Sequence, residues 1–336
     1  MKKFLNDPKN FVDDMLDGIL VAHPDLLKYV NGDKRCLVRA HGGKNKVALV
    51  TGGGSGHLPL FLGYVGEGLL DGCAVGGVFQ SPSADQWYQT AKAADTGKGV
   101  LFIYGNYTGD IMNYEMAKEM LDMDGIRAEE VRGFDDVASA PKGEEAKRRG
   151  VAGIFFMYKC AGAKAEEGGS FDEVKAVAEK VGANVRTMGV ALSPCIIPEV
   201  GKPGFTIDEG DMEIGMGIHG EPGIRRGKLL TAEEVVDEMM KPVLADNPLA
   251  SGDEVSVLIN GLGATPKEEL YVIHRRVNEI LVKDGVKVVK VYVGEFATSM
   301  EMAGFSISVL KLDSELKALL GMHCVTPFFE QRALSF

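Results

Sequence analysis

The chain has 336 residues, of which 45% are hydrophobic, so it can bury a large core. Since most domains have ~100–200 residues, this length suggests about two domains. Its formal net charge of −11 argues against nucleic acid and anionic membranes as partners, because basic surfaces bind both. Five cysteines without a C-x-x-C pair indicate a reducing compartment, and no apolar run approaches the ~20 residues of a membrane helix, so we expect a cytoplasmic protein with no membrane span.

In the first half of the chain, apolar periodicity predicts helices that alternate with short strands. The predicted helices span 9–30, 84–95, 112–123 and 171–182, and the predicted strands span 47–50, 99–104 and 151–158. Alternation of this kind is typical of a layered α/β domain with a mostly parallel sheet. We therefore expect such a domain over residues 1–183.

The pattern changes near residue 184, where a stretch rich in glycine, proline and short apolar runs begins and continues to residue 225. Beyond it, the predicted helices span 231–245 and 266–283, and the predicted strands span 255–259, 286–293 and 306–311. The Thr265-Pro-Lys-Glu268 sequence predicts a capping box that opens the second of these helices at Pro266. We interpret 184–325 as a second, smaller domain of the α/β sandwich type.

Glycine is abundant, with 43 residues, and it is clustered. The clusters lie at 52–56, 215–223 and 261–263, with smaller ones at 42–43 and 76–77. Such clusters mark places where the backbone turns tightly or approaches a ligand. They indicate several loops that converge on one small-molecule site.

The first candidate segment, Gly52-Gly-Gly-Ser-Gly-His57, follows a predicted strand. His57 stands where a G-x-G-x-x-G dinucleotide motif or a G-x-S-x-G nucleophile elbow would need glycine, and no Lys-Ser/Thr pair follows as in a P-loop. A flexible backbone that offers N–H donors and ends in an imidazole suits a small polar ligand at the carboxyl end of a strand. Alternatively, the segment is a tight turn in which His57 is merely hydrogen-bonded.

Asn106-Tyr-Thr-Gly-Asp110 also follows a predicted strand, and the Asp110 carboxylate could accept a proton from a substrate hydroxyl. The alternative is a helix N-cap, for which aspartate is a preferred residue.

The third candidate segment is Gly215-Met-Gly-Ile-His219-Gly-Glu-Pro-Gly223. His219 is flanked by glycine, so little is present for it to pack against. A neutral imidazole is a nucleophile near neutral pH, which makes His219 a candidate nucleophile or ligand; the alternative is an exposed turn histidine.

No histidine or cysteine spacing predicts a metal site.

Five segments together resemble the DhaK subunit of the dihydroxyacetone kinases, over nearly the whole chain. They are the glycine loop ending at His57, the segment 106–110, Gly201-Lys-Pro-Gly204, Gly217-Ile-His-Gly-Glu-Pro-Gly223 and Asn260-Gly-Leu-Gly-Ala-Thr-Pro266.

The resemblance implies a homodimer of two-domain subunits in which the tail 326–336 returns to the first domain. It implies that Nε2 of His219 attacks the carbonyl of a short ketose and forms a hemiaminal. Gly54, Ser55, Gly56 and His57 would line the site, with His57 as general base and Asp110 handling the proton of the hydroxyl that is phosphorylated. The chain itself would hold no cofactor and no metal. The phosphoryl donor, ADP or ATP with Mg²⁺, would be carried by a separate DhaL-type subunit.

Two residues depart from the family's pattern. Leu58 stands where the family usually has glutamate, and Gly105 stands where it usually has a lysine of the substrate site. Removing that lysine opens space, so we expect the pocket to accept a longer ketose such as erythrulose as well as dihydroxyacetone. The departures leave a second interpretation open, in which the chain is a non-catalytic sensor that binds the ketose on His219 and activates a transcription factor.

Overall fold

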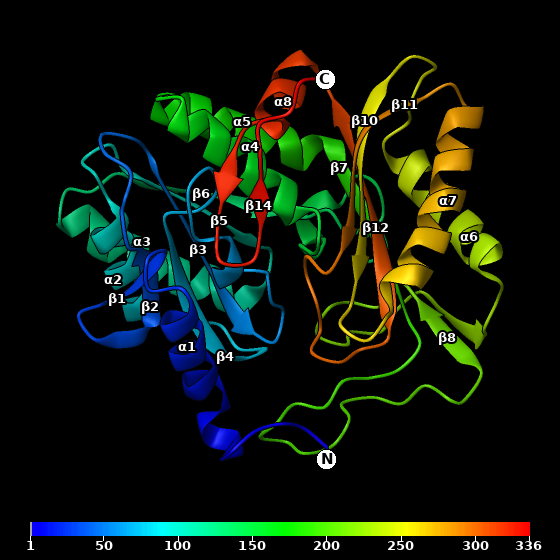
Figure 1. Ribbon diagram of the computed structural model, residues 1–336, viewed down its shortest axis with the longest axis horizontal. Coiled ribbons are helices and arrows are strands. Elements are labelled where there is room, and N and C mark those ends of the chain that lie inside the picture. Colours follow the sequence, from blue (N-terminus) through cyan, green and yellow to red (C-terminus); the bar gives the residue numbers. More distant parts are fainter. Residues whose placement is uncertain (1) are drawn as a thin grey trace.

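The computed structural model describes residues 2–336, which form two six-stranded sheets with helices packed against both (Figure 1). The first sheet has the order β1-β2-β4-β3-β5-β6. Its strands are β1 (Leu27–Val30), β2 (Asp33–Arg39), β3 (Ala48–Ser55), β4 (Gly72–Val78), β5 (Val100–Gly105) and β6 (Ala128–Gly133). The four strands from β4 to β6 are parallel, and only β2 and β1 at one edge pair antiparallel. The expected α/β class with a mostly parallel first sheet is thus confirmed.

Side chains alternate between the two faces of this sheet, as the pleat of a strand requires. Val50 and Phe102 face a core that includes Trp87, on the side covered by α2 (Ala84–Ala94) and α3 (Thr108–Met123). Leu49 and Leu101 face the opposite core, which contains α1 (Phe11–Ala22), α4 (Ile154–Glu166) and α5 (Phe171–Asn184). Both faces of the parallel strands are therefore buried.

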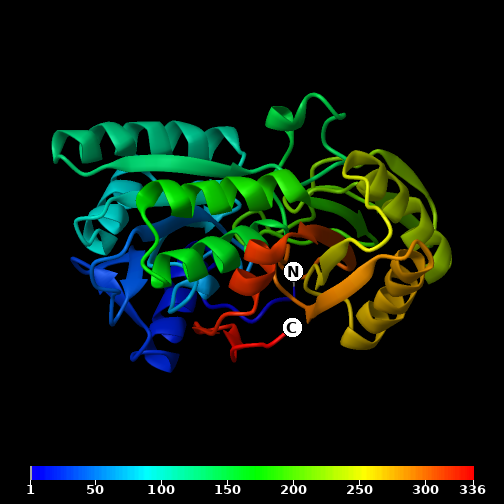
Figure 2. The same ribbon diagram turned by 90° about the horizontal axis from the view of Figure 1, so that it is seen from above.

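The second sheet has the order β11-β10-β12-β7-β8-β9, in which only β10 and β11 are parallel. Its strands are β7 (Val185–Ala191), β8 (Asp211–Ile214), β9 (Arg225–Lys228), β10 (Glu254–Gly261), β11 (Lys287–Gly294) and β12 (Gly304–Leu312). α6 (Ala232–Asp246) and α7 (Lys267–Lys283) cover one face of this sheet. Residues on its other face, such as Leu258 and Leu310, join the same core as α4 and α5, so these helices lie between the two sheets (Figures 1 and 2).

After β12 the chain turns back toward the first sheet (Figure 2). α8 (Ser314–Leu320) packs on α4, and the short strands β13 (Cys324–Val325) and β14 (Glu330–Gln331) form a hairpin. The Val325 backbone N–H donates to the Glu67 carbonyl at 2.9 Å. The C-terminal segment therefore contacts the first half of the chain. Within residues 2–336, no helix has both the length and the apolar character that crossing a membrane requires.

Three sequence-based predictions of local structure are wrong. The helix expected over 9–30 ends at Ala22, because the residue before Pro24 is biased away from helical dihedral angles, and β1 follows. The strand expected over 151–158 is the start of α4, a helix with 11 of its 13 residues buried. An uninterrupted apolar run does not distinguish a buried strand from a buried helix.

The third wrong prediction is the capping box at Thr265. The N-cap of α7 is Pro266, which makes no side-chain capping bond. The Thr265 hydroxyl instead donates to the Gly304 carbonyl at 2.7 Å and accepts from the Gly304 N–H at 2.8 Å, which ties the start of α7 to β12. A capping box does open α6, where Thr231 and Glu234 bond reciprocally.

Candidate active site

The expected site residues on the first sheet lie where its strand order reverses. The chain leaves the central strand β3 for β4 on one side and then returns to β5 on the other side. In open α/β sheets, ligands bind at such a switch point, outside the carboxyl ends of the strands. His57 follows β3, Phe79 follows β4, and Asp110 lies in the first turn of α3 directly after β5.

The glycine tract before His57 belongs to β3 and allows very close packing. A Cβ on Gly54 would lie 2.7 Å from the backbone nitrogen of Gln80, and one on Gly56 would lie 2.7 Å from the ring of Phe79. Gly56 also has a φ of +101°, which favours glycine. Ser55 is buried and donates from its hydroxyl to the Gly76 carbonyl at 2.9 Å. These residues form a dense wall that positions His57.

The His57 ring is fully buried and is held in one tautomer. Its Nδ1 lies 2.8 Å from the carbonyl oxygen of Thr298, and a carbonyl only accepts, so Nδ1 carries the proton and donates. Burial first, and then the nearby His219, lower the pKa of His57 to about 3, so the ring is neutral at physiological pH. Nε2 is buried and has no hydrogen-bond partner among residues 2–336. The ring therefore presents an unused lone pair, as a general base needs.

His219 reaches the same place from the second sheet, on the loop between β8 and β9. Its ring centroid lies 4.7 Å from that of His57, 4.7 Å from that of Tyr107 and 5.3 Å from that of Phe79. The side chain is 23% exposed, so the alternative of a freely exposed turn histidine does not describe it. The structure thus brings together two histidines that are 162 positions apart in the sequence (219 − 57).

Glu221 holds His219 from behind. Its Oε1 lies 3.0 Å from Nδ1 of His219, and its Oε2 accepts from the His219 backbone N–H at 3.0 Å. Burial alone would raise the pKa of Glu221, but the hydrogen bond and charge interaction with His219 outweigh it and hold the pKa down to about 2. An ionised carboxylate only accepts, so Nδ1 of His219 is the donor and Nε2 is left as the free nitrogen.

Asp110 is buried, with 7% of its surface exposed, and it does not cap α3. The N-cap position is Tyr107, and Asp110 lies one turn into the helix. Burial raises the pKa of Asp110 to about 6, against the opposing influence of Ser81 and His219. Its Oδ1 is buried without a hydrogen-bond partner within the described part of the chain. Two buried, unpaired polar atoms, Nε2 of His57 and Oδ1 of Asp110, thus occur among the predicted site residues.

The departures from the family pattern also have structural consequences. A Cβ on Gly105 would lie 2.8 Å from the ring of Tyr107, so the tyrosine ring occupies the space beside this glycine. The Tyr107 hydroxyl donates to the Gly150 carbonyl at 3.1 Å, and its ring is the one that packs against His219. Leu58 accepts from the Thr298 hydroxyl through its backbone carbonyl at 2.9 Å, so its side chain takes no part in this contact.

Sequence reasoning did not identify Phe79, Tyr107, Thr298 or Arg149 as residues around the histidines. Phe79 follows the glycine pair 76–77 and has a φ of +57°, and Tyr107 lies inside the segment that contains Asp110, so the sequence held an indirect signal for these two. Thr298 and Arg149 reach the site only through the fold. Within residues 2–336, no cluster of three histidine, cysteine or acidic side chains is placed to hold a metal ion.

The fold and the site define a two-sheet α/β protein whose paired imidazoles, each with a free Nε2, meet at a switch point of the parallel sheet. The sequence model of the Dak1 domain matches residues 17–328, and the chain belongs to this family. It is 46% identical over 331 residues to the Listeria innocua PTS-dependent dihydroxyacetone kinase 2, dihydroxyacetone-binding subunit DhaK, covering 98% of this chain and 99% of that protein. It is 45% identical to the D-erythrulose kinase of Mycolicibacterium smegmatis, covering 99% of this chain but only 57% of that protein.

Solved structures agree with this assignment. The dihydroxyacetone kinase from C. freundii in complex with AMP-PNP and Mg²⁺ superimposes with a TM-score of 0.90 at 31% identity, over 98% of this chain and 61% of that one. The dihydroxyacetone kinase operon co-activator DhaQ superimposes with a TM-score of 0.88 at 30% identity, over 95% of this chain and 98% of that one. The chain spans about three-fifths of the length of the C. freundii kinase.

Proposed function

We propose that this chain is the substrate-binding subunit of a dihydroxyacetone-type kinase and holds a short ketose as a hemiaminal on His219. The observation that carries the proposal is the pair of imidazoles, His57 and His219, whose ring centroids lie 4.7 Å apart. In each ring Nδ1 is hydrogen-bonded to an oxygen acceptor and Nε2 is left free. A relative of nearly the same length that is named a dihydroxyacetone-binding subunit supports the assignment.

The first step is addition to the carbonyl. The Nε2 lone pair of His219 forms a bond to the carbonyl carbon, the π electrons move to the carbonyl oxygen, and that oxygen takes up a proton from solvent. The ring becomes positively charged, and the Glu221 carboxylate at 3.0 Å pairs with it. Glycerol has no carbonyl and cannot make this bond, so bond formation itself would select the ketose over glycerol. Non-covalent contacts with one small group would discriminate between the two molecules only weakly.

The second step is transfer of the phosphoryl group. The covalent bond fixes the terminal hydroxyl of the ketose, which is catalysis by positioning. Asp110 accepts the hydroxyl proton as the oxygen attacks phosphorus, and the nucleotide departs with the electrons of the broken bond. His57, neutral with Nε2 unpaired, serves as general base near His219. Gly54, Ser55 and Gly56 line the pocket.

The donor nucleotide belongs to a separate DhaL-type subunit, either as ADP that is rephosphorylated by a PTS partner or as ATP with Mg²⁺. The chain itself then needs no cofactor, works as a cytoplasmic homodimer, and the pure chain hydrolyses no ATP. The longer C. freundii kinase binds AMP-PNP and Mg²⁺, and a donor site in the part of that kinase outside the region matched by this chain would fit this proposal. Appreciable ATP hydrolysis by the pure chain would contradict this division of labour.

The substrate is dihydroxyacetone or the four-carbon erythrulose. The absence of a side chain at Gly105 and the placement of Tyr107 support a pocket that differs from one with lysine at this position. The 45% identical D-erythrulose kinase supports the longer ketose.

Calorimetric binding tests the covalent histidine. Dihydroxyacetone, erythrulose and glycerol are titrated into the wild type, His219→Ala and, as a matched control on α7, His274→Ala. We expect both ketoses to bind the wild type and the control, glycerol to bind neither, and His219→Ala to lose the ketoses. Equal binding of glycerol, or unchanged ketose binding by His219→Ala, would refute the proposal.

A second candidate function is a ketose sensor that activates transcription, because the DhaQ co-activator shares the fold over nearly its whole length. Buried Asp110 and His57 favour the kinase, since a sensor needs only the covalent bond to His219. Phosphate transfer to the bound ketose in the presence of a donor subunit separates the two functions.

A further inference from the structure

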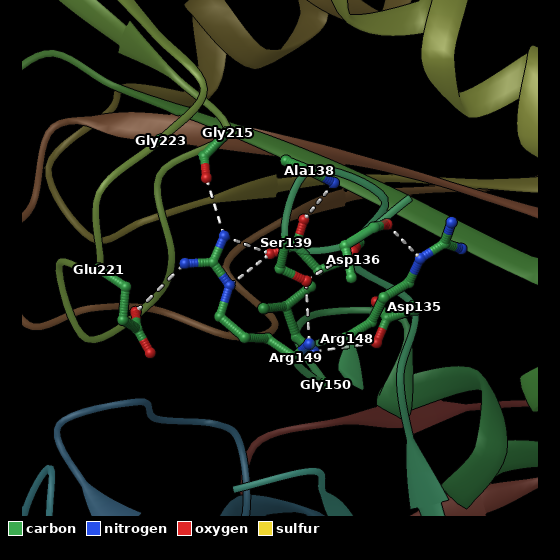
Figure 3. Close-up of polar contacts among 12 residues, drawn as sticks. Asp135, Asp136, Ala138, Ser139, Arg148, Arg149, Gly150, Gly215, Glu221 and Gly223 are labelled. Atoms are coloured by element: carbon green, nitrogen blue, oxygen red, sulfur yellow. Dashed lines mark hydrogen bonds and ion pairs between the residues drawn. The ribbon is translucent and has the colours of Figure 1, made fainter. Parts of the chain in front are cut away.

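The segment between β6 and α4 contacts the loop that carries His219 through one arginine. Nε of Arg149 donates to Oδ2 of Asp136 at 2.8 Å, and Nη2 donates to the Gly215 carbonyl at 2.9 Å (Figure 3). Its third nitrogen, Nη1, lies 3.9 Å from Oε2 of Glu221. One guanidinium therefore reaches a fixed anchor, the start of the His219 loop and the carboxylate that holds His219.

The anchor itself is rigid. Asp136 is 2% exposed, and its Oδ1 accepts from the Ala138 N–H at 3.0 Å. Its backbone N–H donates to the carbonyl of Arg149 at 3.2 Å, so the two residues are bonded through both main chain and side chain. Arg149 is 13% exposed, so its ion pair with Asp136 is largely buried. Arg149 thus presents a fixed fork to the loop.

The His219 loop is shaped to fit this fork. Gly215 has a φ of +82°, and a Cβ on it would lie 2.8 Å from the Cβ of Ala138 in the segment that holds the anchor. A Cβ on Gly217 would overlap the Glu221 carboxylate and would lie 2.5 Å from Nη1 of Arg149. Glycine at these two positions is what allows the loop, the carboxylate and the guanidinium to approach one another.

We propose that Arg149 is a positioning residue for the nucleophile: with Asp136 as its anchor, it fixes the His219 loop and Glu221, and so keeps His219 with its proton on Nδ1 and its Nε2 free. The inference rests on the proposed function, since it concerns the same histidine. The contacts form a series: Asp136 bonds to Arg149, Arg149 forms an ion pair with Glu221, and Glu221 accepts from Nδ1 of His219.

The charges of Asp136, Arg149 and Glu221 alternate in sign along this series of contacts. Asp136 neutralises Arg149, so the guanidinium does not repel the positive charge that develops on the imidazole during addition. The group of Asp136, Arg149 and Glu221 carries a net charge of about −1, which favours that positive charge. Removing the partner that orients a metal-bound imidazole typically changes metal affinity or activity by about 10- to 100-fold, and we take the same range for the reacting imidazole of His219.

The experiment compares wild type, Arg149→Met, Arg149→Lys and Arg127→Met. Arg127 pairs with Glu129 and Asp172 on the exposed surface before β6, at the end of the sheet away from the site, so its variant is the matched control. Adduct formation is followed by carbon-13 NMR with dihydroxyacetone labelled at the carbonyl, and affinity by calorimetry. Nitrogen-15 NMR of the histidine rings reports the fraction of His219 that carries its proton on Nδ1.

We expect Arg149→Met to weaken ketose binding about 10- to 100-fold and to lower the Nδ1–H fraction of His219, while Arg127→Met changes neither. If the methionine variant does not fold, Arg149→Lys decides. Lysine keeps the charge but cannot donate to Asp136 and Gly215 through two separate nitrogens, so we expect a weaker loss in the same direction. A purely structural role would lower stability without moving the tautomer.

Wild-type affinity and an unchanged His219 tautomer in a folded Arg149 variant would overturn the inference. A wild type that forms no adduct would instead overturn the proposed function. The two failures are therefore distinguishable.

Discussion

The substitution Asp110→Asn should stabilise the protein increasingly as pH rises while it slows phosphoryl transfer. Burial raises the pKa of Asp110 from its ordinary value of 3.8 to about 6, so the folded state binds this proton more tightly than the unfolded chain does. Stability is therefore lost as pH rises from 3.8 through 6, because the folded state must give up a proton that it favours. A difference of about two pH units corresponds to about 3 kcal/mol at pH 8, and the side chain is buried enough for most of it to apply.

Asparagine keeps the shape but has no proton to lose. We therefore expect the difference between variant and wild-type free energies of unfolding to grow by about 1.4 kcal/mol between pH 5 and pH 8. Urea denaturation at both pH values measures it, with Asp122→Asn, at an exposed position further along α3, as the control. The comparison across pH cancels any constant cost of burying the new amide. A pH-independent difference would refute burial as the cause of the raised pKa.

The same variant tests the role of Asp110 in the reaction. Turnover with a donor subunit should fall by about 10²- to 10⁴-fold, the range for loss of a general base, because an amide cannot accept the hydroxyl proton. Ketose binding on His219 should change only a few-fold, since the covalent bond does not involve this side chain. Undiminished turnover would remove Asp110 from the mechanism.

Three further predictions follow from buried contacts. Gly105→Lys should displace the Tyr107 ring and reduce erythrulose affinity relative to dihydroxyacetone by about tenfold in calorimetry, and an unchanged ratio would contradict the role of Gly105 in substrate choice. Arg148→Met should cost about 1–3 kcal/mol in urea denaturation, because the buried carboxylate of Asp246 loses the two hydrogen bonds from Arg148, at 2.6 and 2.9 Å, and keeps only its ion pair with Arg186. A cost below about 0.5 kcal/mol would contradict this. Burial lowers the pKa of His57 from 6.5 to about 3, so the unfolded chain binds more protons and the free energy of unfolding should fall as pH drops below 6.5. In His57→Gln the free energy of unfolding should fall less steeply with decreasing pH, as measured by acid denaturation. An equal slope in variant and wild type would contradict the lowered pKa.

Much of the fold could be predicted from periodicity and punctuation. The helices expected over 84–95 and 171–182 correspond to α2 and α5, and both begin at a serine that forms a capping box. The strand expected over 99–104 corresponds to β5 within one residue at each end. These elements are amphipathic or bounded by clear signals, so local sequence specifies them.

The missed elements lack such local signals. β4 contains the pair Gly76-Gly77, which reads as a turn but extends as a strand because Ser55 and Gln80 pack against it. α4 is buried on all sides between the two sheets, so no polar stripe marks its helical period. In both, tertiary packing decides the structure. The division into domains at residue 184 stays a prediction, although β7 does begin at Val185 in the second sheet.

For the site, the sequence predicted candidate residues, but not how the fold holds them. His57, Asp110 and His219 could be singled out because each follows a strand or lies among glycines. Their partners could not, because Thr298 and Arg149 lie 241 and 70 positions from the histidines that they support (298 − 57 and 219 − 149). Only the fold brings such residues together. The tautomers of both rings depend on these distant contacts.

The site's unpaired atoms connect its stability to its selectivity. Nε2 of His57 and Oδ1 of Asp110 are buried without partners among residues 2–336, and each such group costs about 1–3 kcal/mol. A ketose bound as we propose would return that free energy by donating hydrogen bonds from its hydroxyls to both acceptors. Glycerol has hydroxyls too, so the unpaired atoms alone would not exclude it. In the proposed mechanism the covalent bond to His219 would supply the missing discrimination, because only a carbonyl would bring the hydroxyls into the place where Asp110 can accept a proton. Recognition in this site would then be divided, with the hydroxyls contributing affinity and the carbonyl determining which molecule stays long enough to be phosphorylated.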